Sequence, residues 1–479
     1  MSAALISPSS ASAPRGRAMP DEASVARVVG ELQKRFGNRA VTSQAVREQH
    51  AHTTTWIPVQ APDVVVFPQS TDEIAEIVRL CAAERMPVIP FGVGTSLEGH
   101  LNAPYGGVSV DTSQMKAIVA VHPEDLDVVV QPGVTRKELN EYLRDTGLFF
   151  PIDPGADATI GGMAATRASG TNAVRYGTMK DNVLALKVVN PKGEIVHTGS
   201  RARKSSAGND LTRLYVGSEG TLGIITEITL RLSGIPEAIS GGICSFPSLK
   251  AACDAVILTI QCGLPIARIE LLDEVQIRGI NAYSKLSLPE TPLLLFEFHG
   301  TEAGVQEQAE RFGEIATECG GTGFRFSTDA DERSKLWQAR HDVYWASLGL
   351  RPGAKGVATD VCVPISRLAE CLAETKADIE RSGMIAPIAG HVGDGNFHVM
   401  PLVMMDDPAE VETIEGFMHR LVERAMAMDG TCTGEHGVGS GKMKYLTAEH
   451  GAEAIETMRL LKRSLDPDDI MNPGKIVAV

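Results

Sequence analysis

Closely spaced cysteines are absent from this sequence. It contains 8 cysteines, and no two of them form a C-x-x-C pair. Structural zinc sites and iron–sulfur clusters usually draw their thiolate ligands from such pairs, so the sequence argues against both. Reduced, mostly buried cysteines are typical of a cytosolic-type compartment.

Long hydrophobic runs and an excess of positive charge are absent as well. Apolar runs such as 64–67 and 293–296 fall far short of the roughly 20 residues that a membrane-spanning helix needs. Lys and Arg number 45 against 60 Asp and Glu, which gives a formal net charge of −15. Nucleic acid and anionic membranes bind basic surfaces, so neither is expected as the main partner. An anionic substrate would need a local group of positive side chains.

The usual nucleotide fingerprints are also missing. The loop from Phe91 to Gly99 begins like the dinucleotide motif G-x-G-x-x-G, but Leu97 stands at the position of the third glycine. No G-K-[ST] closes the loop, so it is not a P-loop either. The sequence therefore does not predict that this loop binds NAD. The loop does offer backbone amides and the hydroxyls of Thr95 and Ser96, which suit a pyrophosphate, although a plain tight turn would look similar.

The length of 479 residues predicts two or three domains, and a hydrophobic content of 43% is typical of globular proteins. Residues 1–20 are rich in Ser, Ala and Pro and contain arginine but no acidic residue. They predict a disordered tail, with an organelle transit peptide as the alternative. A bacterial-type cytoplasmic location is the first expectation, with attachment to a membrane surface as an option and a mitochondrial location as the alternative.

Hydrophobic periodicity predicts the order of the elements. It indicates a charged amphipathic helix over residues 21–50 and a β-α-β unit over 64–99, followed by short strands and then by alternating strands and helices. The predicted fold class is α+β. The expected parts are a tail (1–20), an N-terminal helical segment (21–57), a first domain (58–235), a second domain (236–430) and a C-terminal segment that packs back on the first domain (431–479).

Three glycine-rich loops carry a resemblance to a known family. Residues 90–99, 153–178 and 217–226 resemble the FAD-binding domain of the vanillyl-alcohol oxidase/PCMH superfamily. The resemblance implies a PCMH-type first domain, in which glycine lets the backbone approach the cofactor closely. Covalent members attach the flavin through a histidine in the first loop. No histidine lies between Pro90 and Gly99, so non-covalent FAD is expected. The expected FAD-binding residues are Pro90, Gly92, Gly94, Thr95, Ser96, Gly99, Pro154, Gly155, Ala156, Thr159, Gly161, Gly162, Ser169, Gly170, Tyr176, Gly177, Glu219, Gly220, Gly223, Ile224, Ile225 and Asn472.

The segment His391–His398 contains two histidines with strand-like flanks. Its central Asp394-Gly395 is a preferred type I′ turn, which would place His391 directly opposite His398. Residues paired in this way have Cβ atoms about 4.5–5.5 Å apart, so both imidazoles would face one metal ion. Two unrelated polar residues on an exposed hairpin are the plainer alternative.

The segment Thr433–Gly439 places Glu435 and His436 between glycines. Glu435 is the expected third ligand of a two-histidine, one-carboxylate metal site with open positions. Such a set suits zinc, manganese or iron, and we favour Zn²⁺ or Mn²⁺. His436 is then left as a general base, while a purely structural role for the pair is the alternative.

These motifs, together with Asn472-Pro-Gly-Lys475, resemble the C-terminal domain of the FAD-linked oxidases. The resemblance spans about residues 45–477 and implies a ferredoxin-like α/β substrate or cap domain. It assigns substrate contacts to Arg340, Lys355 and Asn396, with the two cations on the substrate carboxylate. Arg167 departs from the family, which tends to have a small residue there.

The resemblance implies FAD-dependent oxidation of a D-2-hydroxy acid, with D-lactate first and D-2-hydroxyglutarate or glycolate as alternatives. The metal would lower the pKa of the hydroxyl, His436 would take its proton, and hydride would pass to flavin N5. Electrons would leave to a cytochrome, a quinone or an electron-transfer flavoprotein. A metal-dependent hydrolase and a non-catalytic subunit of a glycolate-oxidising complex are alternatives from other classes. The oligomeric state stays open, with a homodimer as one option.

Overall fold

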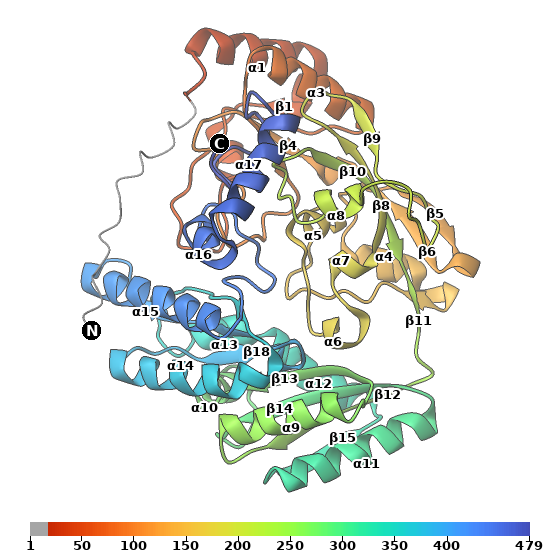
Figure 1. The fold of residues 1–479 in the computed structure, drawn as a ribbon, viewed down its shortest axis with the longest axis vertical. Helices are drawn as coiled ribbons and strands as arrows, with labels where there is room; N and C mark the ends of the chain where they lie inside the picture. The colour runs from red at the N-terminus through yellow and green to blue at the C-terminus, as the bar shows by residue number, and fades with distance from the viewer. Residues whose placement is uncertain (1–17) are drawn as a thin grey trace.

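The computed structural model describes residues 18–479, so the predicted tail and transit peptide lie almost entirely outside the described residues. Helices and strands form two α+β modules, drawn one above the other in Figure 1. Within residues 18–479, no helix is long and apolar enough to cross a membrane.

The N-terminal helix is shorter than its periodicity predicts. Helix α1 (Glu22–Phe36) starts at the N-cap Asp21, whose side chain accepts a hydrogen bond from the Ser24 amide, and it ends before Gly37. A single helix over residues 21–50 was therefore wrong. Gly37 adopts a positive φ of 56°, which stops the helix, and β1 (Ala40–Val41) and α2 (Gln44–Gln49) follow.

The first sheet has the strand order β1-β2-β4-β3 and confirms the predicted β-α-β unit. Its parallel strands are β2 (Val64–Val66), β3 (Val88–Phe91) and β4 (Val108–Asp111). Helix α3 (Thr71–Ala83), capped by Ser70, connects β2 to β3. The first glycine-rich loop therefore leaves the carboxyl end of a parallel strand, where open α/β sheets bind ligands.

The second sheet, of order β5-β6-β10-β8-β9, is antiparallel throughout. The second and third glycine-rich loops approach the end of β3 closely, since a Cβ atom on Gly92 would lie 2.4 Å from Thr159 Oγ1 and one on Gly220 would lie 2.7 Å from the Pro90 side chain. The strands are β5 (Ile118–His122), β6 (Asp127–Val130), β8 (Val183–Val189), β9 (Ile195–His197) and β10 (Ile224–Arg231); the helices are α4 (Arg136–Leu143), α5 (Ile160–Thr166), α6 (Ala173–Tyr176), α7 (Met179–Asn182) and α8 (Leu211–Tyr215).

The lower module is built on a seven-stranded sheet of order β15-β12-β14-β13-β18-β19-β17. Strand β12 was not predicted, because Gly241 and Gly242 interrupt its apolar pattern. A Cβ atom on Gly242 would lie 2.2 Å from the Arg325 carbonyl, so β15 can pack there only against glycine. The strands are β12 (Ala238–Ser245), β13 (Ile266–Leu272), β14 (Leu293–Gly300), β15 (Thr322–Ser327), β17 (Val361–Cys362), β18 (Ile388–Gly390) and β19 (Asn396–Val399).

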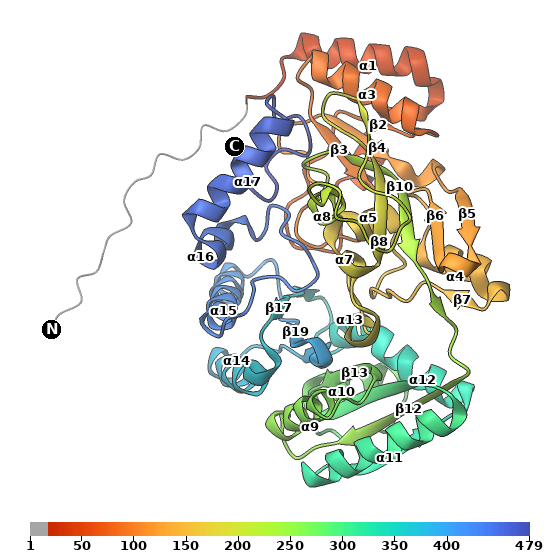
Figure 2. The ribbon, with the colours of Figure 1, turned by 45° about the vertical axis from the view of Figure 1, so that its right-hand side comes forward.

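Helices cover the lower sheet and complete its core, as Figure 2 shows for α9, α11 and α14. The helices are α9 (Leu249–Gln261), α10 (Glu274–Ser284), α11 (Glu302–Glu318), α12 (Ala330–His341), α13 (Val343–Leu348), α14 (Leu368–Ser382) and α15 (Pro408–Ala427). A two-stranded sheet of β16 (Lys355–Gly356) and β20 (Leu402–Val403) lies beside them.

The chain returns to the upper module after α15. Helices α16 (Leu446–His450) and α17 (Ala452–Leu465) lie beside the upper module in both Figure 1 and Figure 2. Met471 forms a bridge with Val88 of β3, and the buried Lys462 Nζ donates to the Thr221 and Met471 carbonyls. The return path therefore carries the Thr433–Gly439 loop past the boundary between the modules.

Candidate active site

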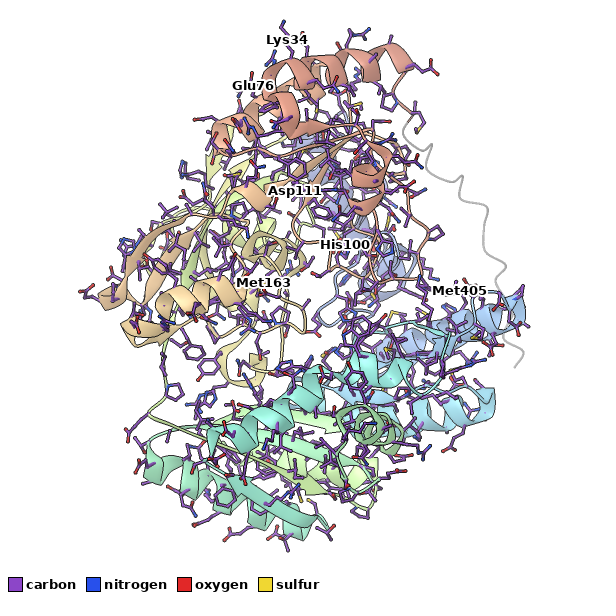
Figure 3. The ribbon with its side chains drawn as sticks, turned by 180° about the vertical axis from the view of Figure 1, so that it is seen from behind. Lys34, Glu76, His100, Asp111, Met163 and Met405 are labelled. Atoms are coloured by element: carbon purple, nitrogen blue, oxygen red, sulfur yellow. The ribbon has the colours of Figure 1, made fainter. Side chains whose placement is uncertain are left out.

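A cavity of about 620 Å³ lies where the two modules meet. On the upper side it is lined by the three glycine-rich loops, and on the lower side by residues of α12, β18 and β19. His100 and Met163, both labelled in Figure 3, line the upper part. The predicted FAD-binding residues that line this cavity are Pro90, Gly92, Gly94, Thr95, Ser96, Pro154, Gly155, Ala156, Thr159, Gly161, Gly162, Ser169, Glu219, Gly220, Gly223, Ile224, Ile225 and Asn472.

Four predicted FAD residues do not line this cavity: Gly99, Gly170, Tyr176 and Gly177. The Tyr176 hydroxyl is paired instead with His299 Nδ1 at 2.7 Å, which joins α6 to β14. Arg167, the departure from the family pattern, also lies outside the cavity. Its side chain donates a hydrogen bond to the Val216 carbonyl at 3.0 Å and packs against Gly217. It therefore supports the start of the third glycine-rich loop.

The upper part of the cavity fits a ligand rich in polar groups. Ser96 Oγ, Thr159 Oγ1 and Asn472 Oδ1 are buried and have no hydrogen-bond partner among the described residues. Buried polar atoms are nearly always satisfied in native proteins, so these atoms indicate a missing partner. A Cβ atom on Gly92 would lie 2.4 Å from Thr159 Oγ1, which shows how closely the first loop approaches the second.

Three side chains meet at the lower end of the cavity. Glu435 Oε1 lies 3.2 Å from His391 Nε2 and 3.2 Å from His398 Nε2. One ligand atom from each residue lies within 4.8 Å of the others, a spacing that could hold a metal ion. His391 Nδ1 faces Glu270, and His398 Nδ1 donates to the Thr359 carbonyl at 3.0 Å. Each histidine therefore turns its Nε2 atom towards Glu435.

The hairpin that carries the two histidines differs from the predicted one. Residues Val392–Asp394 form a 3-10 turn, and His398 pairs with Ala389 instead of His391. The two-residue type I′ turn was therefore wrong. The register is displaced by two residues, and because side chains alternate between faces with period two, His391 and His398 still share one face. Their ring centroids lie 5.3 Å apart.

His436 lies beside this cluster. Its ring is stacked on that of His398 with centroids 5.1 Å apart, and its Nδ1 atom is buried without a partner among the described residues. Burial is the main reason that the pKa of His436 falls to about 4. The ring is therefore neutral near pH 7, the form in which a histidine accepts a proton.

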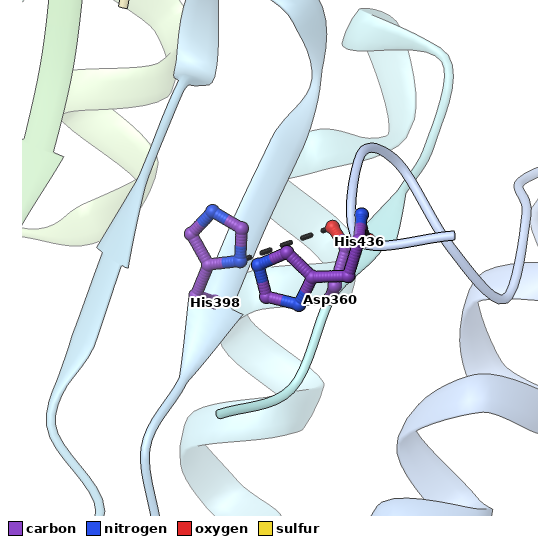
Figure 4. Close-up of side chains that lie close together, drawn as sticks. All are labelled: Asp360, His398 and His436. Carbon is purple, nitrogen blue, oxygen red and sulfur yellow. Dashed lines mark hydrogen bonds and ion pairs between the residues drawn. The ribbon is translucent and has the colours of Figure 1, made fainter. Parts of the chain in front are cut away.

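Asp360, which the sequence did not single out, holds the loop of Glu435 and His436. Figure 4 shows it beside His398 and His436. Its carboxylate accepts the backbone amides of both Glu435 and His436 at 2.9 Å, and the Asn396 amide at 2.7 Å. Asn396, predicted to contact substrate, therefore supports Asp360 and does not line the cavity.

The two cations predicted to bind substrate lie in different places. Arg340, near the end of α12, lines the cavity, and its Nε and Nη2 atoms bind Glu270 Oε2 at 2.8 and 2.6 Å. Lys355, in β16, is not among the lining residues. The structure thus brings Arg340, and not Lys355, together with the histidine cluster.

Two families of known proteins match this chain. Residues 62–199 match the FAD binding domain, and residues 235–476 match the family described as FAD linked oxidases, C-terminal domain. The chain belongs to the FAD-linked oxidases. Its upper module is an FAD-binding domain, and a metal-dependent hydrolase would leave that domain unexplained.

Curated relatives of this FAD-linked oxidase cover most of its length. It is 52% identical over 459 residues to a probable mitochondrial D-lactate dehydrogenase from Danio rerio, covering 95% of this chain and 92% of the relative. It is 52% identical over 421 residues to the mitochondrial D-lactate dehydrogenase (cytochrome) of Arabidopsis thaliana, covering 88% and 74%. Glycolate oxidase subunit GlcD of Bacillus subtilis is 33% identical over 440 residues, covering 91% and 93%.

Solved structures confirm the fold of the oxidase. p-Cresol methylhydroxylase with bound substrate has a TM-score of 0.81 at 16% identity, and the match covers 96% of this chain and 99% of that one. Alkyldihydroxyacetonephosphate synthase has a TM-score of 0.75 at 20% identity, covering 93% and 85%. The predicted PCMH-type fold with a FAD-linked oxidase C-terminal domain is therefore confirmed.

Sequence reasoning missed two fully buried acids of the oxidase, Glu270 and Asp360. The available signal was that each stands within an apolar stretch, Ile266–Leu272 for Glu270 and Val357–Val363 for Asp360. Charged residues are rarely fully buried unless they are paired, so each of these acids implied a cationic or hydrogen-bonding partner.

Proposed function

We propose that this FAD-linked oxidase oxidises D-lactate to pyruvate and passes the electrons to a cytochrome-type acceptor. One observation carries the proposal: the glycine-rich loops form one end of the cavity, and a set of catalytic-type side chains lines the other. That set consists of Arg340, His436 and the cluster of His391, His398 and Glu435. The names and the 52% identity of the two D-lactate dehydrogenases support it.

Each group at the lower end has a task in this reaction. Bound FAD would supply the two-electron acceptor, and a divalent ion, Zn²⁺ or Mn²⁺, held by His391, His398 and Glu435 would supply Lewis acidity. Arg340 holds the substrate carboxylate, since it is the cation that lines this end. His436 accepts the hydroxyl proton, because burial keeps its ring neutral.

The charge of the cavity favours a small monocarboxylate. Among the described residues that line it, Arg340 is the one arginine or lysine, and the lining also includes the apolar side chains of Val357, Met400 and Met418. The second carboxylate of D-2-hydroxyglutarate would have to leave water for these apolar side chains. No second arginine or lysine of the lining would be there to pair with it. Lactate carries a methyl group there instead.

The relatives also bear on location. Those from Danio rerio and Arabidopsis thaliana are named as mitochondrial, and the first expectation of a cytoplasmic location has no support from them. We therefore propose a mitochondrial location.

Anaerobic stopped-flow bleaching of the flavin tests the reaction. The purified protein should be yellow and should be reduced much faster by D-lactate than by L-lactate, glycolate or D-2-hydroxyglutarate. Faster reduction by D-2-hydroxyglutarate or by glycolate would refute the substrate, and faster reduction by L-lactate would refute the stereochemistry. A colourless protein with no response to added FAD would refute the reaction class.

A further inference from the structure

Glu270 lies in β13, at the middle of the lower sheet, and its side chain is fully buried. Its two oxygens have different partners. Oε2 accepts hydrogen bonds from Arg340 Nε at 2.8 Å and Nη2 at 2.6 Å, while Oε1 lies 2.8 Å from His391 Nδ1. One carboxylate therefore contacts both the cation and the histidine that the proposed reaction uses, and it does not line the cavity itself.

These contacts limit the nitrogen atoms with which each partner can bind a ligand. A carboxylate on Nδ1 keeps the proton of His391 on that nitrogen, so Nε2 is left as the metal-ligating atom and faces Glu435. Glu270 takes the side of the guanidinium formed by Nε and Nη2, so Arg340 can offer Nη1 to a ligand in the cavity. The bidentate grip that uses Nε and Nη2 is not available to the substrate.

We propose that Glu270 is a positioning residue that orients His391 towards the metal and Arg340 towards the substrate carboxylate through one shared carboxylate. This inference rests on the proposed function, because it assumes that the cluster of His391, His398 and Glu435 binds a divalent ion. The two effects are coupled: a change at Glu270 weakens metal binding and substrate binding together, although Glu270 touches neither.

The chain contains a matched control for this carboxylate. Glu297, in the neighbouring strand β14, is also buried between an arginine and a histidine: Oε1 lies 3.6 Å from Arg268 Nη1 and 2.8 Å from His299 Nε2. Neither partner belongs to the metal cluster. Glu297→Gln therefore removes a buried charge of the same kind from the same sheet without touching His391 or Arg340.

The test compares Glu270→Gln with Glu297→Gln in the flavin-loaded protein after removal of metal. Co²⁺ is titrated by calorimetry and by its long-wavelength absorption, and KM for D-lactate is measured on the reloaded protein. Glu270→Gln should weaken Co²⁺ binding about 10–100-fold, the usual effect of losing an outer carboxylate partner of a histidine ligand. It should also raise KM, while the FAD content stays at the wild-type level. Glu297→Gln should leave Co²⁺ affinity unchanged.

A second variant covers the case in which Glu270→Gln does not fold. In Glu270→Gln/Arg340→Gln no charge is left unpaired, so folding is retained more readily. Its Co²⁺ affinity should still be reduced, because His391 has lost its charged acceptor. Wild-type Co²⁺ affinity in this double variant, or equal Co²⁺ affinities in Glu270→Gln and Glu297→Gln, would overturn the inference. A wild-type protein that binds no Co²⁺ at the cluster would instead refute the metal site, and the inference with it.

Discussion

Asp360 Oδ2 accepts the backbone amide of His436 at 2.9 Å. The same atom accepts the amide of Glu435 and the hydroxyl of Thr433, so one buried oxygen fixes the whole turn that presents the proposed third metal ligand and the proposed base. Lys442 Nζ lies 3.7 Å away and contributes a positive charge. Burial alone would raise the pKa of Asp360, but the positive charge of Lys442 and these hydrogen bonds hold it well below its usual range.

Asp360→Asn should therefore damage both stability and activity. The amide cannot accept all of these donors, and Lys442 loses a buried anionic partner, so the free energy of unfolding should fall by about 3 kcal/mol. Urea denaturation and the rate of flavin bleaching measure the two effects. Thr433→Val, which removes one neutral donor, should cost only about 1 kcal/mol. Equal losses in the two variants would contradict the central role of the Asp360 charge.

The three proposed metal ligands give a second prediction. His391→Ala, His398→Ala and Glu435→Gln should each lose the divalent ion and most of the activity, while FAD stays bound, because the glycine-rich loops are untouched. Metal analysis and the flavin absorption of the purified variants check both halves. His419→Ala, in the exposed histidine of α15 that pairs with Glu423, is the control and should keep both cofactors. Full metal content in His398→Ala would show that the cluster is assigned incorrectly.

The mode of FAD attachment gives a third prediction. The loop between Pro90 and Gly99 contains no histidine, so acid or heat should release the flavin from the denatured polypeptide. Ultrafiltration followed by absorption of the filtrate measures the release. His100 lies next to this loop and lines the cavity, so it is the residue to examine by mass spectrometry if the colour stays with the protein.

A fourth prediction concerns the glycines of the first two loops. A methyl group at Gly92 would lie 2.4 Å from Thr159 Oγ1, whereas one at Gly155, which also lines the cavity, has no atom within 4 Å. Gly92→Ala should therefore weaken FAD binding by about 1–3 kcal/mol, the usual cost of overpacking, and Gly155→Ala should change it little. The dissociation constants come from titrating each apoprotein with FAD. The reverse order of effects would show that the cofactor does not lie along this contact.

Lys475 gives a prediction about pH. Burial lowers the pKa of its ammonium group to about 8, from the usual 10.5 of a lysine. Between these values the unfolded chain binds more protons than the folded one, so stability should rise as the pH increases from about 8 to 10.5, by roughly 3 kcal/mol. Denaturant unfolding of wild type and Lys475→Met at several pH values isolates this contribution. A difference between the two proteins that does not change with pH would contradict the shifted pKa.

The sequence predicted this protein well where local patterns decide the structure. The sequence pattern predicts a helix over residues 211–215 and a strand over residues 224–231, and α8 and β10 have these bounds. It failed where tertiary contacts decide. The turn after His391 takes a 3-10 form because Gly395, at a φ of 77°, packs so closely on Val363 that a Cβ atom would lie 2.0 Å from its carbonyl oxygen, and no local pattern reveals that contact.

The candidate site shows the same division. Its histidines and Glu435 belong to short motifs, which can be read from the sequence. Glu270 and Asp360 act through partners far away in the chain: Arg340 is 70 residues from Glu270, and His436 is 76 residues from Asp360. Spacing alone cannot predict such pairings, because they depend on how β13 and the 431–440 loop are packed.

The return of residues 431–479 to the upper module has a consequence for biosynthesis. A ribosome that has made residues 1–430 has completed most of the wall of glycine-rich loops, but it has not yet supplied Glu435, His436 or the buried Asn472 that lies against them. Domains tend to fold in the order in which they are synthesised. The nascent protein therefore passes through a stage in which much of its proposed flavin-binding surface exists while the proposed proton acceptor, His436, does not. We therefore expect activity only once residues 431–479 have packed against the upper module.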